Sequence, residues 1–296
     1  MLLRKQSLSL QAKKHFGLFA NPFTSELKNA DELYQTADIR YVRSAMLDTA
    51  KHGGFIAVTG ESGAGKTTLK RDLIDRLKRE NQHVIVIEPY VLATEDNDIK
   101  GKTLKAVHLA EAILHALSPL ENAKRSPEAR FRQIHNALKE SNKAGNKHVL
   151  IIEEAHSLPL PTLKHLKRFF ELEDGYDKLL GIILIGQNEL AIKLSEQNPA
   201  IREVVQRCEM VTLEPIAPSE LASYLQHRLG KTPLANIIDD SGINAMISKL
   251  ARFDNKGKVS QSLLYPLAIG NLMTGAMNGA AELGVPTINA DLMINL

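Results

Sequence analysis

The feature that most constrains this chain is the octapeptide at residues 60–67, Gly-Glu-Ser-Gly-Ala-Gly-Lys-Thr. It fits the pattern G-x-x-x-x-G-K-[ST] at every position, and its flanks fit as well. An apolar run, Phe55–Thr59, leads into it, and a segment with Leu69, Leu73 and Leu77 at helical spacing leads out of it. A strand, a glycine-rich turn and a helix start place several backbone N–H groups around one point. The sequence therefore predicts a phosphate-binding loop.

Two side chains of this loop have expected roles in binding ATP and its metal ion. Lys66 supplies a positive charge to the β- and γ-phosphates, and the Thr67 hydroxyl can ligate Mg²⁺. The alternative is a glycine-rich turn that carries an exposed lysine. The residues expected to surround the nucleotide are Gly60, Glu61, Ser62, Gly63, Ala64, Gly65, Lys66, Thr67 and Thr68.

Short apolar runs alternate with helix-patterned segments over the first two thirds of the chain. Because each run is continuously apolar, we expect strands that are covered on both faces of a parallel sheet. The expected fold is α/β, a five-stranded parallel sheet between helices. The predicted strands are Phe55–Thr59, Val84–Glu88, Val149–Glu153, Leu180–Ile185 and Glu209–Leu213. Predicted helices in this part are Lys66–Glu80, Leu104–Leu117 and Glu128–Ala144.

The strand pattern stops after Pro215 and Pro218, which indicates a domain boundary. Beyond it we expect no strands but helices only, at Ser219–Leu229, Ser241–Ala251 and Ser260–Leu283, followed by a short closing turn. The predicted organisation is a basic N-terminal arm at residues 1–14, a nucleotide-binding core at 15–215 and a small helical domain at 216–296.

Two carboxylates follow the third predicted strand, at Glu153 and Glu154. They lie at the carboxyl edge of the sheet, where open α/β sheets bind their ligands. Glu153 is expected to hold Mg²⁺, and Glu154 is expected to act as the general base that polarises the attacking water. Gln187 follows the fourth strand, where its amide would contact the γ-phosphate or the water. The bland alternatives are the polar start of a loop for the acids and a turn residue for Gln187.

Two arginines, Arg202 and Arg207, precede the fifth strand. An arginine placed there can reach the nucleotide of a neighbouring subunit and stabilise phosphoryl-transfer charge. Arg207 is the first candidate and Arg202 the second, with a surface salt bridge as the alternative for either. A homo-oligomer with an arginine donated in trans is therefore expected.

Charge and cysteine content restrict the setting. The net charge of +3 permits nucleic-acid binding without requiring it. Residues 120–150 hold seven Lys or Arg residues against three acids, which also suits solvated helix faces. The chain has one cysteine, Cys208, and no continuous apolar stretch near 20 residues. We therefore expect a cytoplasmic protein with no membrane span.

The motifs together resemble AAA+ ATPases of the group that holds the secretion ATPase ExeA and the transposition regulators TnsC, TniB and MuB. Besides the octapeptide, the resemblance is carried by the segments at 15–23, 34–36, 153–158, 184–190, 206–207 and 257–259, and it covers roughly residues 13–285. In that group the first segment lies over the adenine, which implies a nucleotide contact for Phe23. Core packing of Phe23 is an alternative compatible with it.

Two departures from the group stand out. The group usually has Asp where Glu153 stands, so the Mg²⁺ geometry can differ and hydrolysis can be slow. Many lids of this kind also carry an arginine for the γ-phosphate, whereas Lys258 is the only basic residue of the matching segment at 257–260.

The resemblance implies an oligomer that binds double-stranded DNA through phosphates and directs a transposase. Lys100, Lys102 and Lys105 follow the second strand, where related oligomers contact DNA, although solvated loop lysines are the alternative. Two other functions stay open. An ExeA-like assembly ATPase would act on protein, and we would expect a membrane span and a wall-binding domain with it. A replication loader would share the DNA-dependent chemistry.

Overall fold

The computed structural model describes residues 5–24, 27, 29–89, 104–195, 201–253 and 259–296. By its contacts the chain divides into two compact units. The core unit holds residues 37–61 and 69–213, and the second unit holds residues 1–36, 62–68 and 214–296. None of the described helices combines the length and the apolar composition that a bilayer-spanning helix needs.

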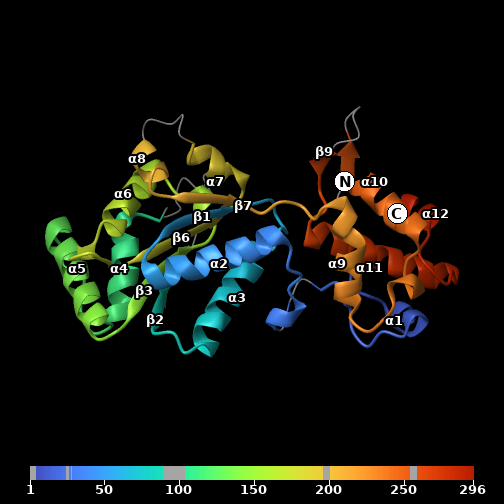
Figure 1. Ribbon diagram of the computed structural model, residues 1–296, viewed down its shortest axis with the longest axis horizontal. Helices are drawn as coiled ribbons and strands as arrows, with labels where there is room; N and C mark the ends of the chain where they lie inside the picture. Colours follow the sequence, from blue (N-terminus) through green and yellow to red (C-terminus); the bar gives the residue numbers. More distant parts are fainter. Residues whose placement is uncertain (1–4, 25–26, 28, 90–103, 196–200, 254–258) are drawn as a thin grey trace. The chain divides into compact units, whose positions relative to one another are not determined.

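The core unit is built on a parallel sheet of five strands in the order β2-β3-β6-β1-β7 (Figure 1). All five strands were predicted, and the structure confirms them within two residues at either end. Parallel pairing places Thr59 of β1 beside Gly186 of β6, and Ile152 of β3 beside Leu184 of β6. The bounds are β1 (Phe55–Thr59), β2 (Val84–Ile87), β3 (Lys147–Ile152), β6 (Gly181–Gly186) and β7 (Glu209–Thr212).

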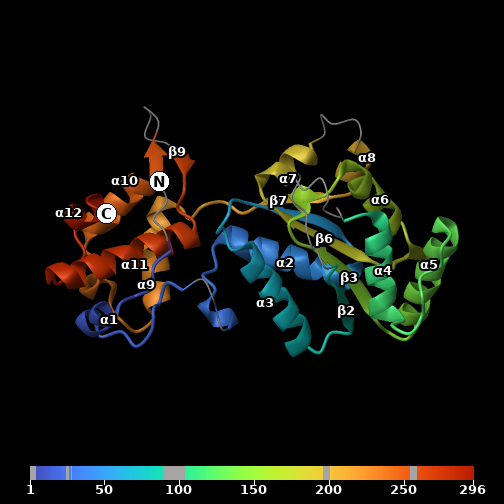
Figure 2. The same ribbon diagram turned by 180° about the vertical axis from the view of Figure 1, so that it is seen from behind.

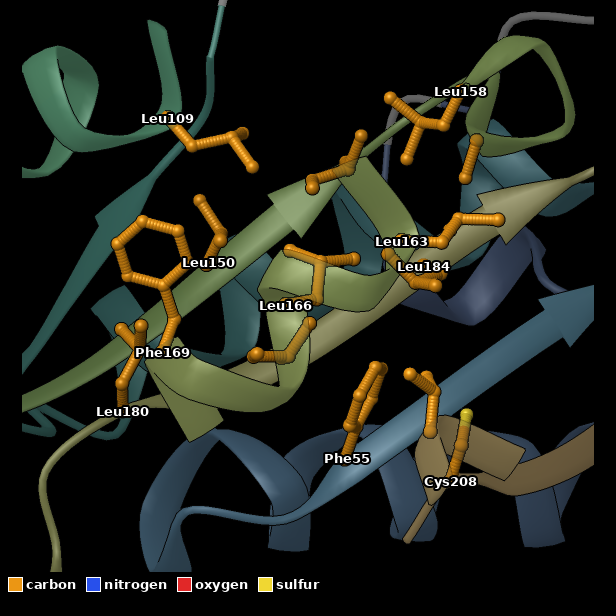
Figure 3. Close-up of a cluster of buried hydrophobic side chains, with 14 of the residues drawn as sticks. Phe55, Leu109, Leu150, Leu158, Leu163, Leu166, Phe169, Leu180, Leu184 and Cys208 are labelled. Atoms are coloured by element: carbon orange, nitrogen blue, oxygen red, sulfur yellow. The ribbon is translucent and has the colours of Figure 1, made fainter. Parts of the chain in front are cut away.

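Helices cover the inner strands β1, β3 and β6 because these strands are apolar on both faces. The expectation of coverage on both faces was wrong for the edge strand β7, which is largely exposed. Leu163 and Leu166 of α6 pack over Leu150 and Leu184 of the sheet, as Figure 3 shows. Helices α4 and α5 lie side by side and add to the same hydrophobic cluster (Figure 2). The core helices are α2 (Ala37–His52), α3 (Lys66–Arg79), α4 (Ala106–Leu117), α5 (Pro127–Lys143), α6 (Leu160–Phe170), α7 (Asn188–Lys193) and α8 (Arg202–Val205), with a 3-10 turn, η2, at Ala155–Ser157.

Helix α2 packs against β1, β3 and β6. It approaches the first residue of β6 so closely that a Cβ on Gly181 would lie 2.3 Å from the backbone oxygen of Thr49. Because the obstructing atom belongs to the backbone, no side chain fits at this position without moving the helix. A short hairpin, β4 (Glu173–Asp174) and β5 (Asp177–Lys178), which the sequence did not predict, precedes β6.

The second unit joins both ends of the chain. Helix α1 (Leu10–Phe16) packs against α11 (Pro266–Leu283), and Figure 1 shows the blue and the red helix together. Asn278 of α11 holds the segment before α1, since it accepts a hydrogen bond from Ser9 N at 2.9 Å and donates one to Ser7 O at 3.0 Å. The other elements of this unit are α9 (Leu221–Leu229), α10 (Asp240–Leu250), β8 (Ala251–Phe253), β9 (Val259–Ser262), α12 (Ala290–Ile294) and the 3-10 turns η1 (Ala30–Glu32), η3 (Pro218–Glu220) and η4 (Leu234–Asn236).

This arrangement differs from the expected organisation in two ways. The described part of the expected arm, residues 5–14, and the segment that follows it group with residues 214–296 rather than with the core. The expectation of helices only after residue 216 was wrong, because β8 and β9 form an antiparallel hairpin. Helix α11 starts at Pro266 instead of Ser260, as a proline favours the first turn of a helix and disfavours a helical residue before it.

A bidentate ion pair joins α2 to α3. Arg43 Nε and Nη2 lie 2.7 and 2.9 Å from the two carboxylate oxygens of Asp72, whose side chain is 7% exposed. Asp72→Ala should lower the free energy of unfolding by about 3 kcal/mol, because it leaves a largely buried guanidinium without its counter-charge. Urea denaturation measures this change.

The matched control is Asp75→Ala on the same helix, which removes the exposed ion pair with Arg79. Exposed pairs contribute little, so this variant should change stability far less. An equal loss in both variants would contradict the importance given to the Arg43–Asp72 pair.

A buried histidine makes stability depend on pH. His148 of β3 donates through Nδ1 to the Leu179 carbonyl at 2.9 Å, and Nε2 accepts from the Ser141 hydroxyl at 2.8 Å. Burial, partly offset by the Leu179 carbonyl, lowers the pKa of His148 below its ordinary value of 6.5. The unfolded chain therefore binds a proton on His148 at a higher pH than the folded chain does. The free energy of unfolding should fall as the pH drops below about 6.5.

Urea midpoints at pH 7.5 and 5.5 test this dependence. His148→Leu should show a smaller difference between the two pH values than the unchanged protein, whereas His83→Gln, at an exposed position, should keep the full difference. An undiminished difference in His148→Leu would show that other groups cause the acid loss.

Candidate functional site

The predicted phosphate-binding loop leaves the carboxyl end of β1 and enters α3 at Lys66. Gly63 and Gly65 have φ values of 82° and 99°, in the left-handed region that favours glycine. The two glycines thus have the backbone that the motif requires. Nucleotide contacts of residues 60–68 stay a prediction.

Polar contacts hold the strand end that carries the loop. Thr59 is fully buried, and its hydroxyl lies 3.1 Å from the Thr212 hydroxyl of β7. Beyond it, Asn188 Nδ2 donates to Glu61 Oε1 at 2.7 Å. The loop is therefore tied to β7 on one side and to the start of α7 on the other.

Glu153, the predicted Mg²⁺ acid, meets a lysine of the loop helix. Lys70 Nζ lies 2.6 Å from Glu153 Oε2 and 2.8 Å from Glu88 Oε1, which follows β2. The Lys70 side chain is only 14% exposed. Burial alone would lower the pKa of Lys70, but the hydrogen bonds and charges of the two glutamates outweigh it and raise that pKa. Lys70 is therefore a fixed cation at this sheet edge.

Glu154, the predicted general base, has an unusual backbone. Its φ of 49° and ψ of 34° lie in the left-handed region, which costs a non-glycine residue free energy. The turn that follows holds it there, because Ser157 donates to the Glu154 carbonyl from its backbone N at 2.9 Å and from its hydroxyl at 2.7 Å. The side chain of Glu154 is 57% exposed, so its carboxylate can meet water.

His156 lies between Glu154 and Gln187. Its Nδ1 accepts from the backbone N of Gln187 at 3.4 Å, so a neutral ring carries its proton on Nε2. That nitrogen is 3.6 Å from Glu154 Oε2. Lys193 of α7 also donates to the His156 carbonyl. The structure thus places one imidazole near the Glu154 carboxylate and in contact with the backbone of Gln187.

The remaining predicted site residues have the following surroundings, or lie outside the described residues. Arg207 is 3.2 Å from Glu171 and donates to the Glu203 carbonyl, whereas Arg202 is exposed in the first turn of α8. Lys105 is exposed at the N-cap of α4. Phe23 is buried in the hydrophobic cluster of the second unit. Lys100 and Lys102 lie outside the described residues.

Sequence reasoning missed Lys70, Glu88 and Asn188, and assigned no role to His156. For Lys70 a signal existed, since it follows Lys66 by four residues and Thr67 by three, and such residues share one face of a helix. The contacts of Asn188 and His156 depend on which strands are neighbours, which periodicity does not reveal.

The donor atoms fit Mg²⁺. A threonine hydroxyl and one carboxylate match the ligands that Mg²⁺ takes beside nucleotide phosphates and water. A carboxylate offers about four lone-pair sites, so the bond from Lys70 leaves Glu153 able to ligate a metal as well. The assignment of Thr67 and Glu153 as the residues that would hold it stays a prediction.

The backbone of Glu154 generates a stability prediction. Glu154→Gly should be about 1 kcal/mol more stable than Glu154→Ala, because both lose the same carboxylate but only glycine adopts this φ without strain. Thermal or urea unfolding compares the two variants.

The control pair is Glu171→Gly and Glu171→Ala, at a φ of −80°. There the glycine variant should be the less stable one, since glycine loses more backbone freedom on folding. If glycine were also the worse residue at position 154, the left-handed backbone would not be the source of the strain.

Sequence comparisons relate part of this chain to known proteins. Residues 48–194 match the model of a family described as AAA domain. General secretion pathway protein A of Aeromonas hydrophila is 29% identical over 178 residues, which cover 60% of this chain. The chain spans about 30% of the length of that relative.

Solved structures share the fold at low identity. Drosophila ORC bound to DNA superposes with a TM-score of 0.60 at 12% identity, over 100% of this chain and 67% of that chain. Cdc6p of Pyrobaculum aerophilum has a TM-score of 0.55 at 13% identity, over 90% and 67%. The ORC1 protein of Aeropyrum pernix, in complex with DNA, has a TM-score of 0.53 at 14%, over 91% and 66%. The α/β core therefore has the AAA+ fold.

Proposed function

We propose that this chain hydrolyses ATP to control its own assembly on double-stranded DNA, and that the assembly directs a transposase. The observation that carries the hydrolytic part is the placement of Glu154. Its carboxylate is exposed at the sheet edge where the phosphate-binding loop begins, and His156 joins it to the strand end that carries Gln187.

In this mechanism the residues of the chain divide the work. The backbone of residues 60–65 and the Lys66 ammonium bind the phosphates, and Glu154 accepts the proton of the attacking water. Gln187 orients the water or the γ-phosphate. Mg²⁺, held by Thr67 and Glu153, would neutralise charge on the phosphates when bound.

An arginine from a neighbouring subunit would complete the site. Arg207 is held by Glu171 within its own core, so it must break that ion pair to reach a neighbour. Arg202 is exposed in the first turn of α8, and no ion pair of its side chain is seen among the described residues. We therefore rank Arg202 beside Arg207 as the donor in trans.

DNA binding is supported by the proteins that share this fold. Two of them, Drosophila ORC and the Aeropyrum pernix ORC1 protein, were solved bound to DNA. On this chain we assign phosphate contacts to Lys105 and, outside the described residues, to Lys100 and Lys102. The transposase partner rests on the motif resemblance alone, and the cytoplasmic setting on the presence of a single cysteine, which is buried.

A second candidate function follows from the match to general secretion pathway protein A. In that case the ATPase would drive the assembly of a protein machine and would not need DNA. A replication loader of the ORC or Cdc6 kind would bind DNA as well, with a helicase as its partner in place of a transposase.

Sedimentation with duplex DNA separates these functions. With ATP and Mg²⁺, Glu154→Gln should stay in the DNA-bound pellet, whereas the unchanged protein should leave it as ATP is consumed, because only the variant lacks the base. Glu189→Gln, which alters an exposed acid of α7, should behave like the unchanged protein.

A salt series in the same assay tests the contacts. Binding through phosphates weakens with salt, and losing one contact should reduce the logarithmic slope by about 0.9. Lys105→Ala should show that reduction and Lys164→Ala should not. Nucleotide binding without any DNA-dependent assembly would contradict the proposal and favour a protein substrate.

A further inference from the structure

The inference concerns Lys70, which lies one turn beyond Lys66 and Thr67 on α3. Residues three and four apart share a helix face, so Lys70 is on the side of α3 from which Lys66 and Thr67 project. From there its Nζ reaches Glu153 Oε2 at 2.6 Å and Glu88 Oε1 at 2.8 Å. A loop helix, β2 and β3 thus converge on one ammonium group.

The charges in this cluster determine what it does to a metal ion. Two carboxylates and one ammonium carry a net charge of about −1, and the ammonium is the most buried of the three side chains. A cation that binds Glu153 must share its carboxylate with Lys70. It also lies close to the positive charge of Lys70 in a region of reduced dielectric, where repulsion between cations is stronger than in water.

We propose that Lys70 is an internal counter-cation that lowers the affinity of Glu153 for a divalent metal ion, so that a higher metal concentration is needed. Glu88 holds the Lys70 ammonium in place. The proposal rests on the proposed function, because it takes Glu153 as the metal ligand. Lys70 touches neither water nor phosphate in this scheme, so it is a regulatory residue of the site and not a catalytic one.

Two substitutions should act in opposite directions. Lys70→Met removes the competing charge, and metal binding should become tighter. Glu88→Gln removes a negative charge and leaves Lys70 to Glu153 alone, and metal binding should become weaker. A purely structural role for the cluster would instead weaken binding in both variants, since either change breaks the same ion-pair network.

The probe is Mn²⁺, whose free ion has an electron paramagnetic resonance signal that disappears on binding. Mn²⁺ is titrated into the full chain with a saturating non-hydrolysable ATP analogue, so the reading does not depend on hydrolysis. Removing one partly screened charge should change the affinity by about three- to tenfold, tighter in Lys70→Met and weaker in Glu88→Gln.

The matched control is Lys78→Met, which removes the same charge from an exposed position two turns further along α3. Its Mn²⁺ affinity should equal that of the unchanged protein. Binding of the analogue in the presence of EDTA verifies that every variant is folded and keeps its nucleotide site.

The outcomes separate the inference from the function on which it rests. If Glu153→Gln loses Mn²⁺ affinity while Lys70→Met gains it, both stand. If Glu153→Gln loses affinity and Lys70→Met is unchanged or weaker, the inference is overturned while Glu153 remains the ligand. If Glu153→Gln binds Mn²⁺ as well as the unchanged protein, the assignment of Glu153 fails and the inference fails with it.

Discussion

The parallel register of β1, β3 and β6 decides where the polar side chains of the site can lie. Thr59 pairs with Gly186 and Ile152 with Leu184, so the three strands end at nearly the same level. The residues that follow them are therefore neighbours at one edge, although they come from three distant parts of the sequence. A shift of one residue in β3 would exchange its two faces and turn the carboxylate that follows it toward a covering helix.

Helices add a second set of connections at that edge. Lys70 extends from α3 to the acids that follow β2 and β3, and Asn188 at the start of α7 reaches Glu61. His156, in the turn after β3, contacts the strand end of β6. Each contact links the ends of two different strands. The elements that cover the core thus also couple the parts of the site.

The sequence predicted the inner strands because they are apolar on both faces and are bounded by glycine, proline or charge. It did not predict the hairpins, since β4 and β5 have two residues each and are polar, and β9 begins a segment that we expected to be helical. Glu153 and Glu154 were predicted because they directly follow a buried strand. Lys70 and His156 act through contacts across the fold, and only the packed chain shows them. Likewise, the grouping of the first 36 residues with residues 214–296 depends on tertiary contacts.

Cys208 gives the chain a practical property. It lies in the core cluster beside Phe55 (Figure 3), and burial raises the pKa of its thiol to about 12. A thiol reacts as the thiolate. Cys208 should therefore react slowly for two reasons, because reagents cannot reach it and because it stays protonated at neutral pH. Cysteines introduced on the surface of each unit would therefore take up a fluorophore selectively, with the native residue left in place.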